Sequence, residues 1–143
     1  MRYALELAEQ AGRLNEIPIG AVVVKDGEII GRGFNRPITA SDPSAHAEIE
    51  ALRDAALALG NYRLSGTSMV VTVEPCTMCA GALIHARIER LIFGAREPRA
   101  GAIFSAAQVL DNPNLNHRVE VVEGVLANEC SKLMSDFFQE RRH

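Results

Sequence analysis

The sequence lacks tryptophan, has few aromatic residues and contains only three cysteines. Three thiols are too few to build the disulfide framework of a small secreted domain. Charges interrupt the first twenty residues, so they hold neither the apolar core of a signal peptide nor a membrane span. We therefore expect a cytoplasmic protein with reduced thiols and no membrane partner.

An excess of positive charge is also absent. The sequence has 15 Lys and Arg residues against 18 Asp and Glu, and its formal net charge is −3. A protein that holds nucleic acid through a generally basic surface would carry the opposite sign. This composition leaves room only for a local basic patch.

What the sequence does contain is the composition of an ordinary globular domain, with 48% hydrophobic and 23% charged residues. A chain of 143 residues removes roughly 68–70% of its unfolded surface from water, so it needs no disulfide or metal merely to fold. We expect one domain over residues 1–143, because no repeat or low-complexity tract divides them.

The hydrophobic pattern predicts alternating helices and strands. Apolar residues near helical spacing predict a helix over 2–14, and two β-branched runs joined by Asp26-Gly27 predict a hairpin over 19–35. A loop over 35–45 follows. The later segments are, in order, helix 46–60, strand 68–73, helix 77–86, strand 90–95, helix 105–112, strand 117–123 and helix 126–142. This order predicts an α/β fold of three layers, with helices on both faces of a mixed five-stranded sheet.

Two of the cysteines, Cys76 and Cys79, lie three residues apart directly after Pro75. In the first turn of a helix the two sulfurs share one face, and the positive helix end favours their thiolates. A redox pair or two buried thiols would show the same motif. If the pair binds zinc, two thiolates leave its tetrahedral sphere incomplete, so a further ligand is needed.

His46 is the candidate third ligand, because it opens a predicted helix thirty residues before Cys76. Two cysteines and one histidine leave the fourth position of zinc to water, as in catalytic sites. Glu48 could collect and return the proton of that water. Taken alone, His46 could simply cap the helix, and Glu48 in the first turn could simply stabilise the helix dipole. The combination of His-x-Glu with Pro-Cys-x-x-Cys favours catalytic zinc.

The motifs HAE at 46–48 and PCTMC at 75–79 resemble the signature of the zinc-dependent nucleobase deaminases, which share the cytidine-deaminase fold. Longer stretches, among them IPIGAVVV, DPSAHAEIEALR and TVEPCTMCAGALIHARI, resemble the bacterial tRNA adenosine deaminases over nearly the whole chain. The resemblance implies hydrolysis of the wobble adenosine of a tRNA anticodon to inosine, usually in the arginine tRNA with anticodon ACG. It also implies one Zn²⁺ per subunit, Glu48 as the proton shuttle, and a homodimer that binds the anticodon stem-loop.

The same resemblance assigns the substrate pocket. Asn35 is expected to hydrogen-bond the target nucleotide, and the backbone at Ala47 and Pro75 to contact the base or the departing ammonia. Pro18 and Ile19 are expected in the pocket wall. From the residues alone, Asn35 would equally suit an ordinary turn.

Outside the pocket, the resemblance places Phe138 and Arg142 on the anticodon loop. An aromatic residue in a terminal helix is also a common core residue, and an arginine there also complements the helix end. Arginines in loops and termini could form a basic rim for the RNA: Arg36, Arg87, Arg90, Arg96, Arg99, Arg141 and Arg142.

Two readings compete with tRNA deamination. The zinc motif alone also suits a deaminase of a free base or nucleoside, such as guanine or cytidine, and the site could belong to a non-catalytic RNA-binding subunit. The terminal DFFQERR favours tRNA, and Glu48 favours catalysis, because a purely structural zinc needs no proton carrier. Phe104 and Gln108 depart from the residues common in the family, which leaves the loop contacts and the substrate preference open but the zinc chemistry intact.

Overall fold

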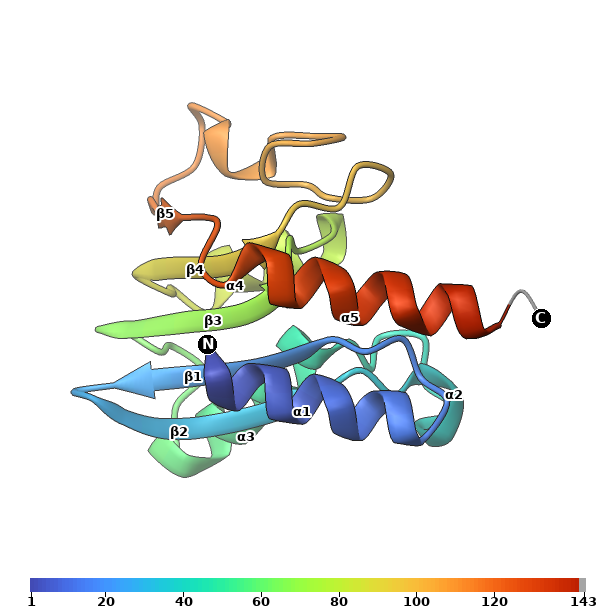
Figure 1. The fold of residues 1–143 in the computed structure, drawn as a ribbon. Helices are drawn as coiled ribbons and strands as arrows, with labels where there is room; N and C mark the ends of the chain where they lie inside the picture. Colours follow the sequence, from blue (N-terminus) through green and yellow to red (C-terminus); the bar gives the residue numbers. More distant parts are fainter. Residues whose placement is uncertain (142–143) are drawn as a thin grey trace.

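The computed structural model describes residues 1–141, which form one mixed sheet of five strands (Figure 1). The strand order is β2-β1-β3-β4-β5. β1 pairs antiparallel with β2 and β3, whereas β3, β4 and β5 run parallel. The strands are β1 Gly20–Lys25, β2 Glu28–Phe34, β3 Thr67–Val73, β4 Arg90–Ala95 and β5 Glu120–Val122.

Helices cover both faces of the sheet (Figure 1). On one face lie α1 (Arg2–Arg13) and α5 (Ala127–Glu140), where Leu5 and Cys130 share a buried cluster. On the other face lie α3 (Ala47–Leu59) and α4 (Thr77–His85). The predicted three-layer α/β fold with a mixed five-stranded sheet is confirmed. Within residues 1–141, no helix has both the length and the apolar character that crossing a membrane requires.

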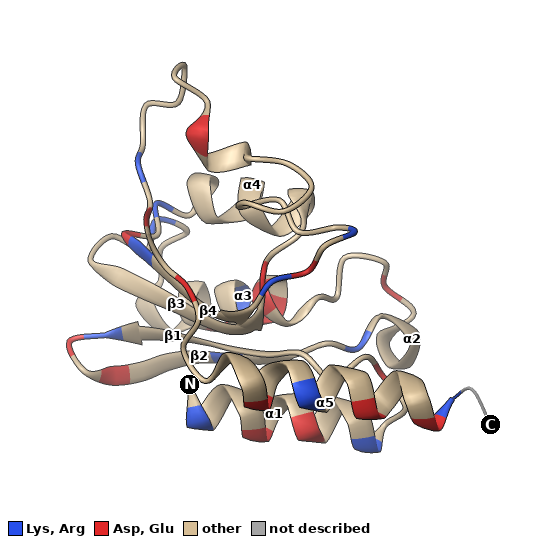
Figure 2. Ribbon diagram, turned by 45° about the horizontal axis from the view of Figure 1, so that its top comes forward, with Lys and Arg blue, Asp and Glu red and all other residues tan. Residues whose placement is uncertain are grey.

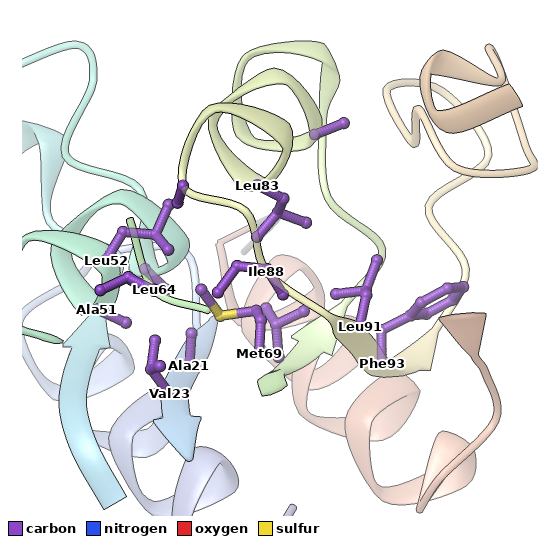
Figure 3. Packing of buried hydrophobic residues seen from close by; sticks show 14 of the residues in the cluster. Ala21, Val23, Ala51, Leu52, Leu64, Met69, Leu83, Ile88, Leu91 and Phe93 are labelled. Carbon is purple, nitrogen blue, oxygen red and sulfur yellow. The ribbon is translucent and has the colours of Figure 1, made fainter. Parts of the chain in front are cut away.

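The main core lies between the sheet and the α3–α4 layer (Figure 3). Val23, Met69 and Leu91 are directly paired across β1, β3 and β4, so their fully buried side chains share one face of the pleat. Leu52 of α3 and Leu83 of α4 meet them from above the sheet. Most other residues of β1 and β3 are buried as well, because helices cover both faces of the sheet.

The predicted hairpin is confirmed, with Asp26 and Gly27 both at positive φ in the turn. The predicted loop over 35–45, however, contains a short helix, α2 (Pro37–Ala40). Pro37 suits its first position, and the Glu16 carboxylate accepts the N–H groups of the first turn. This helix depends on a partner distant in the sequence, so the local pattern does not reveal it.

The predicted helix over 105–112 is wrong. A single 3₁₀ turn, Val109–Asp111, forms there. In an α-helix the Val109 N–H would donate to the carbonyl of Ser105. Here the Val109 N–H donates instead to the carbonyl of Ala102, at 3.0 Å. The segment therefore folds back on its own loop. The predicted strand over 117–123 is also shorter, Glu120–Val122, while α5 lies within its predicted range.

Close packing of α3 on β2 requires glycine at Gly31 and Gly33. A Cβ at Gly33 would collide with the carbonyl oxygen of Ala47 and lie 2.6 Å from the Ala51 nitrogen. These contacts are with helix backbone, which cannot rotate away. The two glycines therefore bring the start of α3 onto the sheet.

We expect Gly33→Ala to destabilise the protein by about 1–3 kcal/mol, because α3 must move to admit the methyl group. Urea unfolding would measure the change. The matched control is Gly12→Ala, whose Cβ would meet only Pro18 at 3.7 Å, an ordinary contact. The control should keep or slightly raise the unfolding midpoint, and an unchanged midpoint in Gly33→Ala would contradict this packing.

A buried carboxylate, Glu16, ties the loop before β1 to α2. Its side chain is 1% exposed and accepts bonds from the Thr39 N–H and hydroxyl, both at 2.6 Å, and from the Ile38 N–H at 3.3 Å. Burial opposes ionisation, but these hydrogen bonds outweigh it and hold the pKa of Glu16 below its ordinary value. The charged form is therefore the one that stabilises the fold.

We expect Glu16 to make stability depend on acid pH. Because its folded pKa lies below the ordinary value of 4.5, its contribution is present above that pH and is lost as pH falls through the folded value. Glu16→Gln should be less stable near neutral pH and lose less stability on acidification, as measured by urea unfolding. The exposed Glu28→Gln should keep the wild-type slope. Equal slopes for Glu16→Gln and wild type would show that the contribution is absent.

Candidate active site

The site forms where the first residues of α3 and α4 meet. His46 is the N-cap of α3 and Cys76 is the N-cap of α4, both with extended backbone. Pro75 ends the extended segment that follows β3, so the chain turns into α4 at Cys76. Both helices present their positive ends to the same point, which favours negatively charged groups there.

Three ligand atoms converge at this point. The Nδ1 atom of His46 lies 3.6 Å from the Cys76 sulfur and 3.5 Å from the Cys79 sulfur. All three donor atoms lie within 4.8 Å of one another. Cys79 is fully buried, whereas His46 and Cys76 are half-buried. These residues, predicted as ligands from the sequence, form a group that could hold a metal ion.

The two thiols differ electrostatically. A hydrogen bond with Cys79, together with one to His46, outweighs burial and lowers the pKa of Cys76 to about 3. The same contact, followed by burial, raises the pKa of Cys79. The two shifts have one cause: the Cys79 thiol donates to the Cys76 sulfur and so favours the Cys76 thiolate. A divalent cation would replace the Cys79 proton and favour both thiolates.

Glu48 lies within the first turn of α3 and is 4% exposed. Burial raises the pKa of its carboxyl to about 7, with a further rise from the charge of Cys76. Glu48 is not a member of the three-residue group that could hold a metal. The arrangement therefore places a buried carboxyl group next to the three candidate ligands.

The residues expected in the pocket wall come from three segments. The Asn35 N–H donates to the Ile19 carbonyl at 3.0 Å, which joins the end of β2 to the segment before β1. Asn35 and Pro18 are buried, and Ile19 is half-buried. Ala47 is fully buried beside His46. The structure thus brings Ile19 and Asn35 together, two residues before α2 begins at Pro37.

The remaining predicted residues are Pro75, Phe138 and Arg142. Pro75 is buried, and its carbonyl accepts the Ala102 N–H at 2.8 Å. Phe138 is 42% exposed on α5, with its ring edge-on to Phe137 at 5.4 Å between centroids, so it is a surface residue and not core. The predicted RNA contact at Arg142 lies outside the described residues.

One buried residue escapes the sequence analysis. Glu74 directly precedes Pro75, is 4% exposed and accepts five hydrogen bonds from the loop after β4. Burial opposes its ionisation, but bonds from Ser105, Phe104 and Glu97 outweigh that effect and lower the pKa of Glu74. An acidic residue at the end of an apolar strand is the one signal that could have drawn attention to it.

The expected basic rim is largely paired with acids. Arg36 contacts Glu50 at 3.4 Å, and Arg90 contacts Glu120 at 3.2 Å. Figure 2 shows Lys and Arg distributed among Asp and Glu over several elements, without one basic face. Positive charge for an anionic substrate is therefore local, as the composition predicts.

Comparison with known proteins identifies the group to which the chain belongs. The profile of the MafB19-like deaminases matches residues 1–142. A tRNA-specific adenosine deaminase of Haemophilus influenzae is 57% identical over 143 residues, which cover 99% of this chain and 83% of the relative. A tRNA-specific adenosine deaminase of Agrobacterium fabrum is 44% identical over 142 residues, which cover 99% of this chain and 93% of the relative.

Solved structures agree. One, from work on deaminases that carry out A-to-I editing at the wobble position of transfer RNA, superposes with a TM-score of 0.90 at 44% identity, covering 93% of this chain and 96% of that one. Guanine deaminase from Nitrosomonas europaea superposes with a TM-score of 0.83 at 26% identity, and the match covers 95% of this chain and 81% of the guanine deaminase. The fold, the His-Cys-Cys group and identities of 44–57% over nearly the full length lead to one conclusion: the chain belongs to the tRNA-specific adenosine deaminase family.

Proposed function

We propose that this protein hydrolyses the wobble adenosine of a tRNA anticodon to inosine and ammonia, with the arginine tRNA of anticodon ACG as its substrate. The observation that carries the proposal is the buried, unliganded Glu48 beside the His46-Cys76-Cys79 group. The names of the relatives at 44–57% identity support the substrate class. The exposed aromatic ring of Phe138 is of the kind on which an unpaired base stacks.

We propose zinc as the metal, one ion per subunit. Around a tetrahedral zinc with Zn–S of about 2.3 Å and Zn–N of about 2.0–2.1 Å, sulfur and nitrogen stand roughly 3.6 Å apart. The observed separations of 3.6 Å and 3.5 Å from His46 Nδ1 to the two sulfurs fit this geometry. The donor set of one imidazole and two thiols also suits zinc.

Bound zinc would supply an activated water at neutral pH. The chain's own part is proton transfer and orientation. Glu48 takes one proton of the water and gives it to N1 of adenine as the water oxygen bonds to C6. The second proton of the water passes through the same carboxylate to the amino group, which then leaves C6 as ammonia. The burial of Glu48 keeps bulk water from competing for these protons. Asn35, Ala47 and the Pro18-Ile19 wall would hold the base in place.

A second candidate function is deamination of free guanine. The similarity to guanine deaminase, with a TM-score of 0.83, favours it over the other small substrates. That protein is only 26% identical, however, whereas the tRNA-specific relative reaches 57%. Phe138 also lies on the surface of α5, where a free base needs no contact.

The proposal further takes residues 1–143 as one domain that acts in the cytoplasm as a homodimer. Support for pairing comes from α4, where Met78 is 39% exposed and a Cβ at Gly81 would meet no atom within 4 Å. An open, partly apolar helix face of this kind suits contact with a second copy.

We expect Cys79→Ala to lose its zinc while Cys130→Ala keeps one ion per chain. Cys79 is a ligand in the proposal, whereas Cys130 is a buried thiol of α5 and outside the ligand group. Metal analysis of the purified proteins by inductively coupled plasma mass spectrometry measures the content. Equal zinc in the two variants would contradict the assigned ligands.

We expect the zinc-loaded protein to convert the wobble adenosine of an ACG-anticodon tRNA transcript, read out by sequencing. Glu48→Gln preserves shape and zinc but cannot shuttle protons, so its rate should fall by roughly 10²–10⁴-fold. Glu28→Gln, the same change at the exposed first residue of β2, should keep the wild-type rate. Full activity in Glu48→Gln would refute the mechanism, and release of ammonia from guanine but not from tRNA would favour the second candidate.

A further inference from the structure

The Glu74 carboxylate organises the loop that follows β4. Its Oε2 atom accepts three consecutive backbone N–H groups, from Ile103 at 3.1 Å, Phe104 at 2.8 Å and Ser105 at 3.0 Å. Its Oε1 atom accepts the Glu97 N–H at 3.1 Å and the Ser105 hydroxyl at 2.5 Å. One side chain therefore binds both ends of the segment 97–105 and fixes its path.

Backbone contacts complete this arrangement. A Cβ at Gly101 would collide with the Glu74 carboxyl group, so only glycine allows the loop to pass over it. The next residue, Ala102, donates its N–H to the Pro75 carbonyl at 2.8 Å. The loop thus wraps around Glu74 and Pro75, immediately before the metal-ligand candidate Cys76.

The loop contacts a surface arginine, Arg96, through the ring of Phe104. The Phe104 ring packs against Phe93 of the core at 6.1 Å between centroids, and the guanidinium of Arg96 lies 5.0 Å from the centre of the same ring. Arg96 also forms two hydrogen bonds of 2.9 Å with Glu123. Glu74 holds the Phe104 backbone and thereby the ring against which Arg96 lies.

Arg96 and its neighbours form one wall of a groove of about 600 Å³. Arg99 lies on the same wall, Phe138 and Gln139 of α5 lie opposite, and Val73 contributes at the carboxyl end of β3. None of the three ligand candidates lines this groove. Its two arginines, exposed aromatic ring and amide are groups that suit the phosphates and unpaired bases of single-stranded RNA.

We propose that Glu74 is a positioning residue for the RNA substrate: by holding the loop 97–105, it shapes the groove wall that binds nucleotides next to the target adenosine. The proposal rests on the proposed function. Glu74 touches neither the substrate nor the reacting atoms, since its five bonds are all committed to the loop. It should therefore govern how tightly RNA binds and leave the chemical step alone.

The test is Glu74→Gln. Glutamine keeps the shape, but its NH₂ replaces an oxygen that accepts at least two hydrogen bonds, so at least two donors face it in either orientation. We expect KM for an anticodon stem-loop RNA to rise roughly tenfold, with kcat within about threefold of wild type and zinc content unchanged. The Kd for the same RNA, measured by fluorescence anisotropy in a Glu48→Ala background, should rise by the same factor.

Two further variants provide a milder test and a control. Ser105→Ala removes one of the five bonds and should raise KM by roughly two- to threefold, which keeps the proposal testable if Glu74→Gln folds poorly. Glu28→Gln, at the exposed first residue of β2, should leave KM and Kd unchanged. Hydrogen exchange at residues 103–105 should accelerate in Glu74→Gln, while β3 stays protected.

The outcomes distinguish failure of the Glu74 inference from failure of the proposed function. If wild type converts and binds the stem-loop but Glu74→Gln shows the same KM and Kd, this inference fails and the proposed function stands. A fall in kcat or in zinc content with unchanged Kd would also overturn it, because the carboxylate would then act on the metal-ligand segment. If wild type neither binds nor converts the RNA, the proposed function fails, and this inference fails with it.

Discussion

The convergence of two helix starts at one point is the arrangement on which the site depends. His46 begins α3 and Cys76 begins α4, and their donor atoms are 3.6 Å apart. The positive ends of both helices favour thiolates and a carboxylate at a place where burial would otherwise oppose them. Gly31 and Gly33 allow α3 to approach the sheet closely enough for this meeting. Small backbone displacements there would separate the ligands.

Three glutamates are buried, and each is stabilised in a different environment. Glu16, Glu48 and Glu74 are 1%, 4% and 4% exposed. A buried carboxylate needs hydrogen bonds or a partner. Glu16 obtains its bonds from the first turn of α2, and Glu74 obtains its bonds from the loop after β4. Those two fix the course of α2 and of the loop 97–105. Glu48 is the one whose environment leaves it suited to exchange protons.

The division between chemistry and recognition follows from the same layout. The ligand group and Glu48 lie at the helix starts, which an adenosine deaminase and a guanine deaminase can share. The groove between the loop 96–99 and α5 is a separate surface built from the end of β4 and the last helix. Because most of the expected rim arginines that the structure describes pair with acids, the proposed RNA binding would depend on a few cations.

The sequence by itself determined the layers, the strands and the three candidate ligands, because apolar periodicity and the motifs His-x-Glu and Cys-x-x-Cys are local features of the chain. It did not reveal α2 or the non-helical course of 105–112. Both depend on buried carboxylates distant in the sequence: Glu16 accepts the first amides of α2, and Glu74 holds the loop before Val109. Only the tertiary structure decided those segments, because a hydrogen bond between distant residues leaves no periodic trace in either of them.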